Sequence, residues 1–311
     1  MTVVSIYGAL APKGPSGFGY GSTAEQVTEG ISLAGQHILV TGCNSGIGFE
    51  TLRVLALRGV RVLGTARSLE KAQSSCAKVS GQTLPLACEL SDPKSVQSCI
   101  AAVAATGLTL DAIVCNAGVM APAKLAQAHG YELQFFTNHI GHFMLVTSLL
   151  EQLAERGRVV MLSSDAHRHA PAAGIEFDNL DGRKHYSGWA AYGQSKLANL
   201  LFAKQLARRF AGSGRTANAV HPGVIRTNLQ RHMNPLVAGV LAVVGPLALK
   251  SVEQGAATQV YAATNPQLAG VSGQFLANCN IAEPRPDAND EALARKLWTE
   301  SEKIVAALTA S

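Results

Sequence analysis

The stretch that decides the fold is TGCNSGIG, residues 41–48, which follows the short apolar run Ile38–Val40 and opens an amphipathic segment. A strand, a glycine-rich turn and a helix in this order are typical of a phosphate-binding βα unit. Gly42 permits a tight turn, Gly46 lets the backbone approach a pyrophosphate, and Gly48 lets helix and strand pack closely. Glycines needed for turn conformation alone are the alternative, but their position in the first βα unit favours a dinucleotide site.

The rest of the chain alternates short β-branched runs with longer amphipathic stretches. Most of the runs are apolar throughout, as in a parallel sheet buried on both faces. The predicted strands are Ile38–Val40, Val60–Thr65, Thr83–Leu90, Ala112–Cys115, Arg158–Leu162, Ala217–Val220 and Gln274–Leu276, and the predicted helices include Gly48–Arg58, Pro93–Ala105, Gly141–Glu155 and Tyr192–Ala211. We therefore expect an α/β fold, a single doubly wound (Rossmann) domain over residues 35–311 with a mostly parallel seven-stranded sheet and helices on both faces. Residues 1–34 are predicted to form an N-terminal arm with a short helical stretch at Ser22–Gly30.

The composition excludes several classes of protein. Of the 311 residues, 47% are hydrophobic and 15% are charged, which excludes a disordered chain. The net charge of +5 comes from scattered side chains, so no nucleic-acid partner is predicted. The longest apolar run, Leu236–Leu249, is interrupted by Gly and Pro and is shorter than the ~20 residues of a transmembrane helix. Without a secretory signal pattern or a C-x-x-C pair among the six cysteines, we expect a cytoplasmic protein with reduced thiols.

A tyrosine and a lysine lie four positions apart in YGQSK, residues 192–196. On a helix this spacing places Tyr192 and Lys196 on one face. A free tyrosine, with a pKa of about 10, is a poor acid–base group at neutral pH, and a nearby ammonium favours its phenolate and lowers that pKa. The pair is a candidate for acid–base catalysis, although the Y-x-x-x-K pattern alone is common.

The residue after the second predicted strand discriminates between dinucleotides at sites of this kind. An acidic residue there accepts a hydrogen bond from a free ribose 2′-hydroxyl, whereas this chain has Arg67, which can pair with a 2′-phosphate. Arg67 predicts a preference for NADP(H). If Arg67 is only a solvated residue at the start of the next helix, NAD(H) is the alternative.

Six motifs in a fixed order carry a resemblance to a known family. They are TGCNSGIG at 41–48, Asn116-Ala117-Gly118 after the fourth strand, Asn138 in TNHIGHF, Ser163-Ser164 after the fifth strand, YGQSK at 192–196 and His221-Pro222-Gly223 after the sixth. From residue 36 to about 305, the sequence resembles short-chain dehydrogenase/reductases of the retinol-dehydrogenase-like and WW-domain-oxidoreductase-like subgroup. We expect no WW domain ahead of this region.

The resemblance implies an oxidoreductase that interconverts a hydrophobic alcohol and its ketone or aldehyde with a nicotinamide cofactor. Tyr192 would be the acid/base, Lys196 would lower the pKa of Tyr192 and bind the nicotinamide ribose, and Ser164 would stabilise charge on the reacting oxygen. Asn138 would hold a water that links Lys196 to solvent. The implied cofactor-binding residues are Gly42, Asn44, Ser45, Gly46, Ile47, Gly48, Arg67, Glu89, Leu90, Asn116, Ala117, Gly118, Tyr192, Lys196, Pro222, Gly223 and Thr227.

Two features depart from the family pattern. Glu89 stands after the third strand, near the adenine, where the family usually has aspartate. Ser164 and Tyr192 are further apart than in the simplest members, because residues 167–189 form an inserted loop. Relatives of the retinol-dehydrogenase type share the longer spacing, so Ser164 keeps its predicted role.

An apolar lid over the substrate is predicted around residues 229–250. The same run would equally serve as a homodimer contact or as a surface that rests on a membrane. The lid implies a hydrophobic substrate, and the choice between a retinoid, a steroid, another lipid-like compound and a smaller aromatic ketone stays open.

Other functional classes fit the sequence less well. Ser164, Asp165 and His167 have the residue types of a hydrolase triad, but they crowd one loop and no G-x-S-x-G turn exists. A binding or scaffold protein that keeps the fold without turnover is the main alternative, although intact Ser164, Tyr192 and Lys196 argue against it. Two histidine pairs lack the carboxylate or cysteine partners that complete a metal site, so no metal is predicted; they are His139 with His142 and His167 with His169.

Overall fold

The centre of the fold is an eight-stranded sheet in the computed structural model, which describes residues 8, 10–225 and 249–310. The strand order is β10-β9-β8-β7-β4-β1-β2-β3, and all neighbours are parallel except β9 and β10. The strands are β1 (His37–Val40), β2 (Arg61–Ala66), β3 (Thr83–Ala87), β4 (Leu110–Cys115), β7 (Leu153–Leu162), β8 (Thr216–His221), β9 (Phe275–Ala277) and β10 (Asn280–Ile281). The predicted α/β class is confirmed. The eighth strand, β10, has two residues, too few to produce a sequence pattern.

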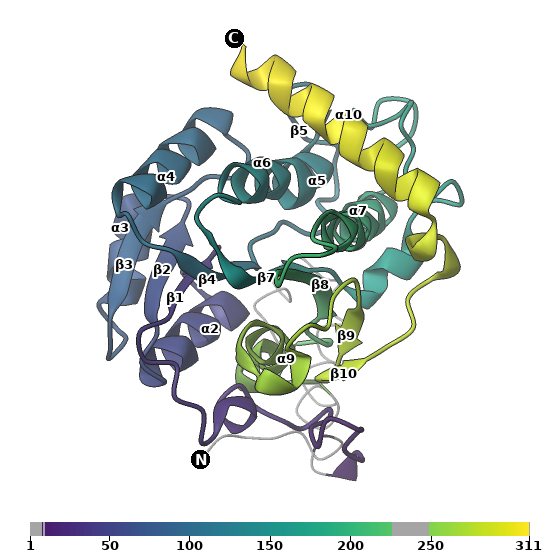
Figure 1. The fold of residues 1–311 in the computed structure, drawn as a ribbon. Coiled ribbons are helices and arrows are strands. Elements are labelled where there is room, and N and C mark those ends of the chain that lie inside the picture. Colours follow the sequence, from purple (N-terminus) through teal and green to yellow (C-terminus); the bar gives the residue numbers. More distant parts are fainter. Residues whose placement is uncertain (1–7, 9, 226–248, 311) are drawn as a thin grey trace.

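Helices cover both faces of this sheet (Figure 1). One face carries α4 (Pro93–Ala105), α5 (Leu133–Phe135), α6 (Gly141–Ser148), α7 (Gly188–Arg209) and α10 (Glu291–Thr309), and the other carries α2 (Gly46–Leu57) and α9 (Val252–Thr264). A further helix, α3 (Leu69–Cys76), connects β2 to β3. In β1, Leu39 packs into the first layer, and Ile38 and Val40 into the second. Because successive side chains of a strand alternate between faces, both faces demand apolar residues.

Short elements complete the described part of the chain. They are η1 (Gln26–Thr28), the hairpin β5 (Gln127–Ala128) and β6 (Tyr131–Glu132), the π-helix η2 (Phe136–Ile140), η3 (Asp165–His169), η5 (Pro266–Leu268) and η6 (Pro286–Asn289). In the described ranges, no helix has the length and apolar character needed to cross a membrane. All six cysteines are buried free thiols, as the sequence predicts.

The helix predicted over residues 141–155 is wrong at its C-terminal end. Helix α6 ends at Ser148, and β7 begins at Leu153, which pairs with Leu110 of β4. The charged stretch after Leu153 has good local helix formers, but β7 pairs with β4 at Leu153 and again from Arg158, and this pairing on both sides outweighs that weak preference. Smaller differences are that β3 ends at Ala87 and that α2 and α7 begin earlier than predicted, at Gly46 and Gly188.

The strand order reverses between β1 and β4. From β1 the chain proceeds through β2 to β3 at one edge, and from β4 it proceeds through β7 and β8 toward the other. Ligands of doubly wound sheets bind at the carboxyl ends of the strands beside such a reversal. The topology therefore places the functional site above β1, β4 and β7.

The segment before β1 packs against the second helix layer. Ala24, Val27 and Leu33 are buried in the cluster that contains the apolar side chains of α2 and α9. Glu25 accepts a hydrogen bond from Arg53 of α2 at 2.6 Å, and Ala24 N donates to Glu253 O of α9 at 2.9 Å. These contacts hold the segment against the two helices.

Candidate active site

The glycine-rich turn joins β1 to α2 at the reversal of strand order. Gly42 and Gly46 have φ values of +73° and +56°, a conformation that favours glycine. A Cβ at Gly48 would lie 2.1 Å from the carbonyl oxygen of Gly42, whereas a Cβ at Gly46 would meet nothing within 4 Å. Ser45 is the N-cap of α2, but its side chain makes no capping hydrogen bond. The N-terminus of α2 thus packs closely against the turn, has no side-chain cap and has open space beside Gly46, and these features fit a pyrophosphate.

The Asn116-Ala117-Gly118 triplet holds this turn from the end of β4. The backbone N–H groups of Asn116 and Ala117 both donate to Thr41 Oγ1, at 2.9 and 3.0 Å. Asn116 Nδ2 donates to Thr41 O at 2.8 Å. A Cβ at Gly118 would lie 2.9 Å from Asn138 Oδ1, so glycine is required where the triplet passes the next motif. The triplet therefore supports the turn and borders the catalytic residues.

Three of the four predicted catalytic side chains come together where β7 ends and α7 begins. Ser164 directly follows Ser163 at the end of β7 and caps η3, and its side chain is near enough to the Tyr192 hydroxyl to lower the pKa of that phenol. Lys196 lies one turn further along α7, buried, with Nζ 5.5 Å from the centre of the Tyr192 ring. Ser163 Oγ donates to Lys196 O at 2.7 Å, which ties α7 to the strand.

The electrostatics of the pair differ from the sequence prediction. Burial raises the pKa of Tyr192 to about 12, and the hydrogen bond with Ser164 lowers it by less. Burial outweighs the lowering expected from Lys196, whose Nζ donates to Leu162 O at 3.0 Å and lies 5.5 Å from the centre of the ring. Burial also lowers the pKa of Lys196 to about 8. At neutral pH, Tyr192 is therefore protonated and Lys196 is mostly charged.

Asn138 lies in the π-helix η2 and is completely buried. Its amide nitrogen donates to Val119 O at 3.0 Å and to Ser195 Oγ at 2.9 Å, while its Oδ1 accepts from Val119 N at 2.8 Å. Ser195 Oγ in turn donates to Tyr192 O at 2.8 Å. The side chain of Asn138 thus braces the catalytic helix against the segment after β4, and its role in a water relay stays a prediction.

Three residues predicted to bind the adenosine half of the dinucleotide follow strands β2 and β3. Arg67 immediately follows β2 and is exposed, and its guanidinium makes no hydrogen bond or ion pair within the described residues. Glu89 is half-buried, and its Oε1 accepts from Ser91 N and Oγ at 3.2 and 2.9 Å. Leu90 is buried. Arg67 is therefore free to meet an anionic group, whereas Glu89 is partly engaged within its own loop.

A buried cation, Lys250, lies beside the residues predicted to bind the nicotinamide end of the cofactor, and the sequence did not predict it. Pro222 and Gly223 follow β8, and a Cβ at Gly223 would lie 2.5 Å from Lys250 Cδ. Lys250 is buried, with Nζ 4.8 Å from the centre of the Tyr20 ring and no hydrogen-bond partner among the described residues. Burial lowers its pKa to about 8. Its sequence signal is a lone lysine that ends a long apolar run.

Parts of the prediction fall outside the described residues. They are Thr227 and most of the lid around residues 229–250, of which Leu249 and Lys250 are described. Near this region, Val224 is exposed directly after Gly223, and Trp189 is exposed three residues before Tyr192. The ring centres of Trp189 and Tyr192 are 6.2 Å apart. Apolar side chains are therefore exposed near Tyr192, the predicted acid/base.

The residues proposed for a hydrolase do not form a triad. His167 Nδ1 lies 2.6 Å from the backbone oxygen of Ser164, and His167 Nε2 accepts from Arg285 N at 3.0 Å. Both ring nitrogens are thus bonded to the backbone, and neither is bonded to Ser164 Oγ. Within residues 8, 10–225 and 249–310, no group of three His, Cys, Asp or Glu side chains could hold a metal ion.

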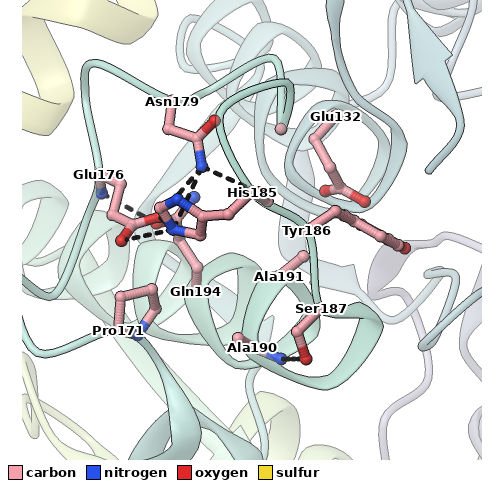
Figure 2. A pocket seen from close by; sticks show the side chains of 11 residues that line it. Glu132, Pro171, Glu176, Asn179, His185, Tyr186, Ser187, Ala190, Ala191 and Gln194 are labelled. Carbon is pink, nitrogen blue, oxygen red and sulfur yellow. Dashed lines mark hydrogen bonds and ion pairs between the residues drawn. The ribbon is translucent and has the colours of Figure 1, made fainter.

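A cavity of about 250 Å³ lies beside the first turns of α7 (Figure 2). Its polar wall includes Glu132, Glu176 and His185, and Ala191 and Gln194 line it from α7. His185 Nε2 lies 3.0 Å from Glu176 Oε2, and Gln194 Oε1 accepts from Glu176 N at 2.9 Å. Tyr192 does not line this cavity, so the cavity is separate from the catalytic hydroxyl.

A glycine-rich turn after the first strand and a Ser–Tyr–Lys cluster after the fifth are typical of nicotinamide-dependent dehydrogenases with a doubly wound sheet. The family model "short chain dehydrogenase" matches residues 36–237, and the chain belongs to this family. A short-chain dehydrogenase TIC 32 B, chloroplastic, of Brassica napus is 42% identical over 98% of this chain and 100% of its own. Human retinol dehydrogenase 13 is 38% identical over 88% of this chain and 86% of its own, which supports the retinol-dehydrogenase-like subgroup.

Solved structures agree with this assignment. A crystal structure from Mycobacterium Paratuberculosis has a TM-score of 0.73 and 32% identity, and covers 90% of this chain and 97% of its own. A blue fluorescent protein from a metagenomic library, solved in complex with NADPH, has a TM-score of 0.62 and 25% identity, and covers 79% and 97%. Proteins of this fold therefore include one that binds a phosphorylated nicotinamide dinucleotide.

Proposed function

We propose that the protein is an NADP(H)-dependent oxidoreductase that interconverts a hydrophobic alcohol and its ketone or aldehyde by hydride transfer. The observation that carries the proposal is the convergence of Ser164, at the end of β7, with Tyr192 and the buried Lys196, in the first turns of α7. A phenol, a hydroxyl and an ammonium gathered in one place are the groups that a carbonyl oxygen needs as it becomes an alkoxide. The nicotinamide cofactor supplies the hydride chemistry when it is bound.

In the reductive direction, Tyr192 gives its phenolic proton to the substrate oxygen. A pKa raised to about 12 by burial keeps Tyr192 protonated at neutral pH, which suits a proton donor. Ser164 donates a hydrogen bond to the same oxygen and stabilises the charge that develops there. In the oxidative direction, Tyr192 takes the hydroxyl proton, and this step requires its phenolate.

Lys196 stabilises that phenolate and would hold the nicotinamide ribose. Its Nζ lies 5.5 Å from the Tyr192 ring centre and already donates to Leu162 O, so its position is defined before any ligand binds. Two hydrogen bonds hold this part of α7 in place, one from Asn138 Nδ2 to Ser195 Oγ and one from Ser195 Oγ to Tyr192 O. A preorganised site of this kind needs little rearrangement during reaction.

The residues that would hold the dinucleotide fit its charge. The turn at Gly42–Gly48 offers the uncapped start of α2 to the pyrophosphate, and the free Arg67 lies at the end of β2, where the adenosine ribose is expected. Pairing of Arg67 with a 2′-phosphate supports NADP(H) over NAD(H). The exposed side chains of Trp189 and Val224 support an apolar substrate, as does the predicted lid.

The test is an assay of NADPH consumption with a panel of aldehydes and ketones graded from small polar compounds to large apolar ones, with the Tyr192→Phe enzyme as the blank. We expect turnover of the apolar members and kcat/KM values that rise with apolar surface. NADPH binding without turnover across the panel would favour the scaffold alternative. A cytoplasmic location, a homodimer and a peripheral membrane contact stay predictions, and the name of the Brassica napus relative places that relative in a chloroplast.

A further inference from the structure

A buried histidine connects the glycine-rich turn to the π-helix that carries Asn138. His142 has no exposed surface. Its Nε2 lies 2.9 Å from Thr41 Oγ1, and its Nδ1 lies 2.9 Å from the backbone oxygen of Asn138. Thr41 is the first residue of the cofactor turn, and Asn138 braces the catalytic helix. One imidazole ring thus spans two parts of the site that are far apart in sequence.

The partners of the ring determine where its proton must be. Thr41 Oγ1 accepts hydrogen bonds from two backbone N–H groups, those of Asn116 and Ala117. A hydroxyl has two acceptor positions and one donor, so the Thr41 hydroxyl proton remains for His142 Nε2. The Asn138 backbone oxygen can only accept, and therefore Nδ1 of His142 must carry the ring proton. Only the neutral tautomer with its proton on Nδ1 satisfies the Thr41 hydroxyl, the Asn138 carbonyl and both ring nitrogens.

The local backbone explains how the ring reaches this carbonyl. Residues Phe136–Ile140 form a π-helix, in which Gly141 N donates to Phe136 O, five residues earlier. His142 follows Asn138 by four residues, and helical side chains point back toward the N-terminus, so the ring lies over the Asn138 carbonyl, with Nδ1 2.9 Å from its oxygen. π-Helical turns are frequent at functional sites, which agrees with the position of Asn138.

We propose that His142 is a positioning residue that couples the cofactor turn to the catalytic helix through the sequence Thr41, His142, Asn138, Ser195 and Tyr192. The proposal rests on the proposed function, because the residue at the end of this chain is the assigned acid/base. Each link after His142 is a hydrogen bond, from Asn138 Nδ2 to Ser195 Oγ at 2.9 Å and from Ser195 Oγ to Tyr192 O at 2.8 Å. A shift of the turn would therefore reach the backbone of Tyr192.

The surroundings of His142 keep the ring neutral. Burial lowers its pKa to about 4, the hydrogen bond to the Asn138 backbone raises it, and the nearby charge of Lys196 lowers it further. The other titratable group that acts in this region is His139, whose pKa burial lowers to about 3. His139 Nε2 lies 2.8 Å from Ser301 Oγ of α10, away from the turn. The two histidines of TNHIGHF therefore bond to different parts of the protein.

The first measurement is the tautomer of His142 in the ¹⁵N-labelled protein at neutral pH, by NMR of the two ring nitrogens. We expect a protonated Nδ1 and an unprotonated Nε2, with His139 assigned separately from a His139→Phe sample. A protonated Nε2 or a charged ring at neutral pH would overturn the proposal. This readout does not depend on turnover, so it separates a failure of the link from a failure of the proposed function.

The second measurement compares variants along the link. Thr41→Val removes the hydroxyl, Thr41→Ser keeps it, and His142→Phe removes both ring bonds. We expect Thr41→Val and His142→Phe to lower kcat about tenfold or more and to raise the Kd for NADPH several-fold, with little change in the KM for the carbonyl. Thr41→Ser should restore wild-type values, which a role in packing alone would not predict.

His139→Phe is the matched control, because it removes a second buried histidine, three residues before His142, that contacts neither Thr41 nor the Asn138 backbone oxygen in the described hydrogen bonds. It should retain kcat and the Kd for NADPH near wild type. Equal losses in the control and in His142→Phe would refute coupling through His142. If His142→Phe does not fold, the Thr41→Val and Thr41→Ser pair decides, since equal kcat values in those two enzymes would also refute it.

Discussion

Two polar regions flank the first turns of α7, and they are built in opposite ways. The proposed catalytic cluster of Asn138, Ser164, Tyr192 and Lys196 is tied to backbone groups by buried and partly buried hydrogen bonds. The loop around the cavity in Figure 2 instead relies on exposed ion pairs, such as Lys184 with Asp178, whose side chains are 56% and 76% exposed. Buried, fully bonded polar groups have fixed positions, whereas exposed pairs are screened by water.

The difference indicates where geometry matters to function. The catalytic cluster places a protonated phenol, a hydroxyl and an ammonium at defined positions, although burial carries a cost for each polar group. The loop of residues 171–187 carries more charge at its surface, and its ion pairs are largely exposed. We therefore expect substitutions in the cluster to change the rate and substitutions in the exposed pairs to change little.

The strongest test of the cluster is Tyr192→Phe, which removes the proton and keeps the ring. We expect kcat to fall by a factor on the order of 10² to 10⁴, the usual contribution of general acid–base catalysis. The Kd for NADPH should stay near wild type, measured by titration of cofactor fluorescence. Near wild-type turnover in a folded Tyr192→Phe enzyme would remove the basis for the whole site.

Ser164→Ala should have the next largest effect. The variant loses the proposed hydrogen-bond donor to the reacting oxygen, so kcat should fall by about 10²-fold. Steady-state kinetics at saturating NADPH would measure it. Ser163→Ala serves as the comparison, because Ser163 Oγ donates to Lys196 O and does not reach Tyr192 in the described contacts. A smaller loss in Ser164→Ala than in Ser163→Ala would contradict the assignment.

The buried Lys196 predicts a pH-dependent stability. Its pKa is lowered to about 8 by burial, against about 10.4 in an unfolded chain. Between these values the unfolded state binds more protons, so the free energy of unfolding should rise with pH, by about 1 to 3 kcal/mol from this group. Urea unfolding at several pH values from 8 to 10 would measure it.

Lys196→Met provides the control for this measurement, because it cannot titrate. The variant should show a smaller rise over the same pH range, and the rise that remains would include Lys250, whose pKa burial also lowers to about 8. Identical pH profiles for the wild type and Lys196→Met would show that Lys196 titrates normally.

Arg67 offers a smaller and more selective effect, since it lies outside the buried cluster. Arg67→Ala should weaken NADPH about tenfold and leave NADH nearly unchanged, because only NADPH carries the 2′-phosphate. Dissociation constants for both cofactors on both proteins would test this. Equal affinities in the wild type, or equal losses in the variant, would show that Arg67 does not select the cofactor.

The smallest effect is expected in the loop. Lys184→Ala removes one partner of an exposed pair, so neither kcat nor Tm should change measurably. Thermal unfolding and the carbonyl assay on the same sample would check both. A loss of kcat comparable to that of Ser164→Ala would show that the loop and the cluster are not as different as their burial indicates.

The sequence by itself determined the features that depend on local pattern. Fully apolar runs such as Ile38–Val40 require a sheet covered on both faces, and the glycines of residues 41–48 require a tight turn before a helix. The i, i+4 spacing of Tyr192 and Lys196 placed them together on α7. These features can be predicted from the sequence because each depends on a few neighbouring residues.

Only the tertiary structure decided the features that depend on distant contacts. The strand β7 begins at Leu153, where local sequence favours a helix, because β4 offers it hydrogen-bond partners. Burial raised the pKa of Tyr192 where the adjacent lysine predicted a lowering. The link from Thr41 through His142 to Asn138 joins residues a hundred positions apart. Desolvation and long-range hydrogen bonds arise from packing, so no local sequence pattern reports them.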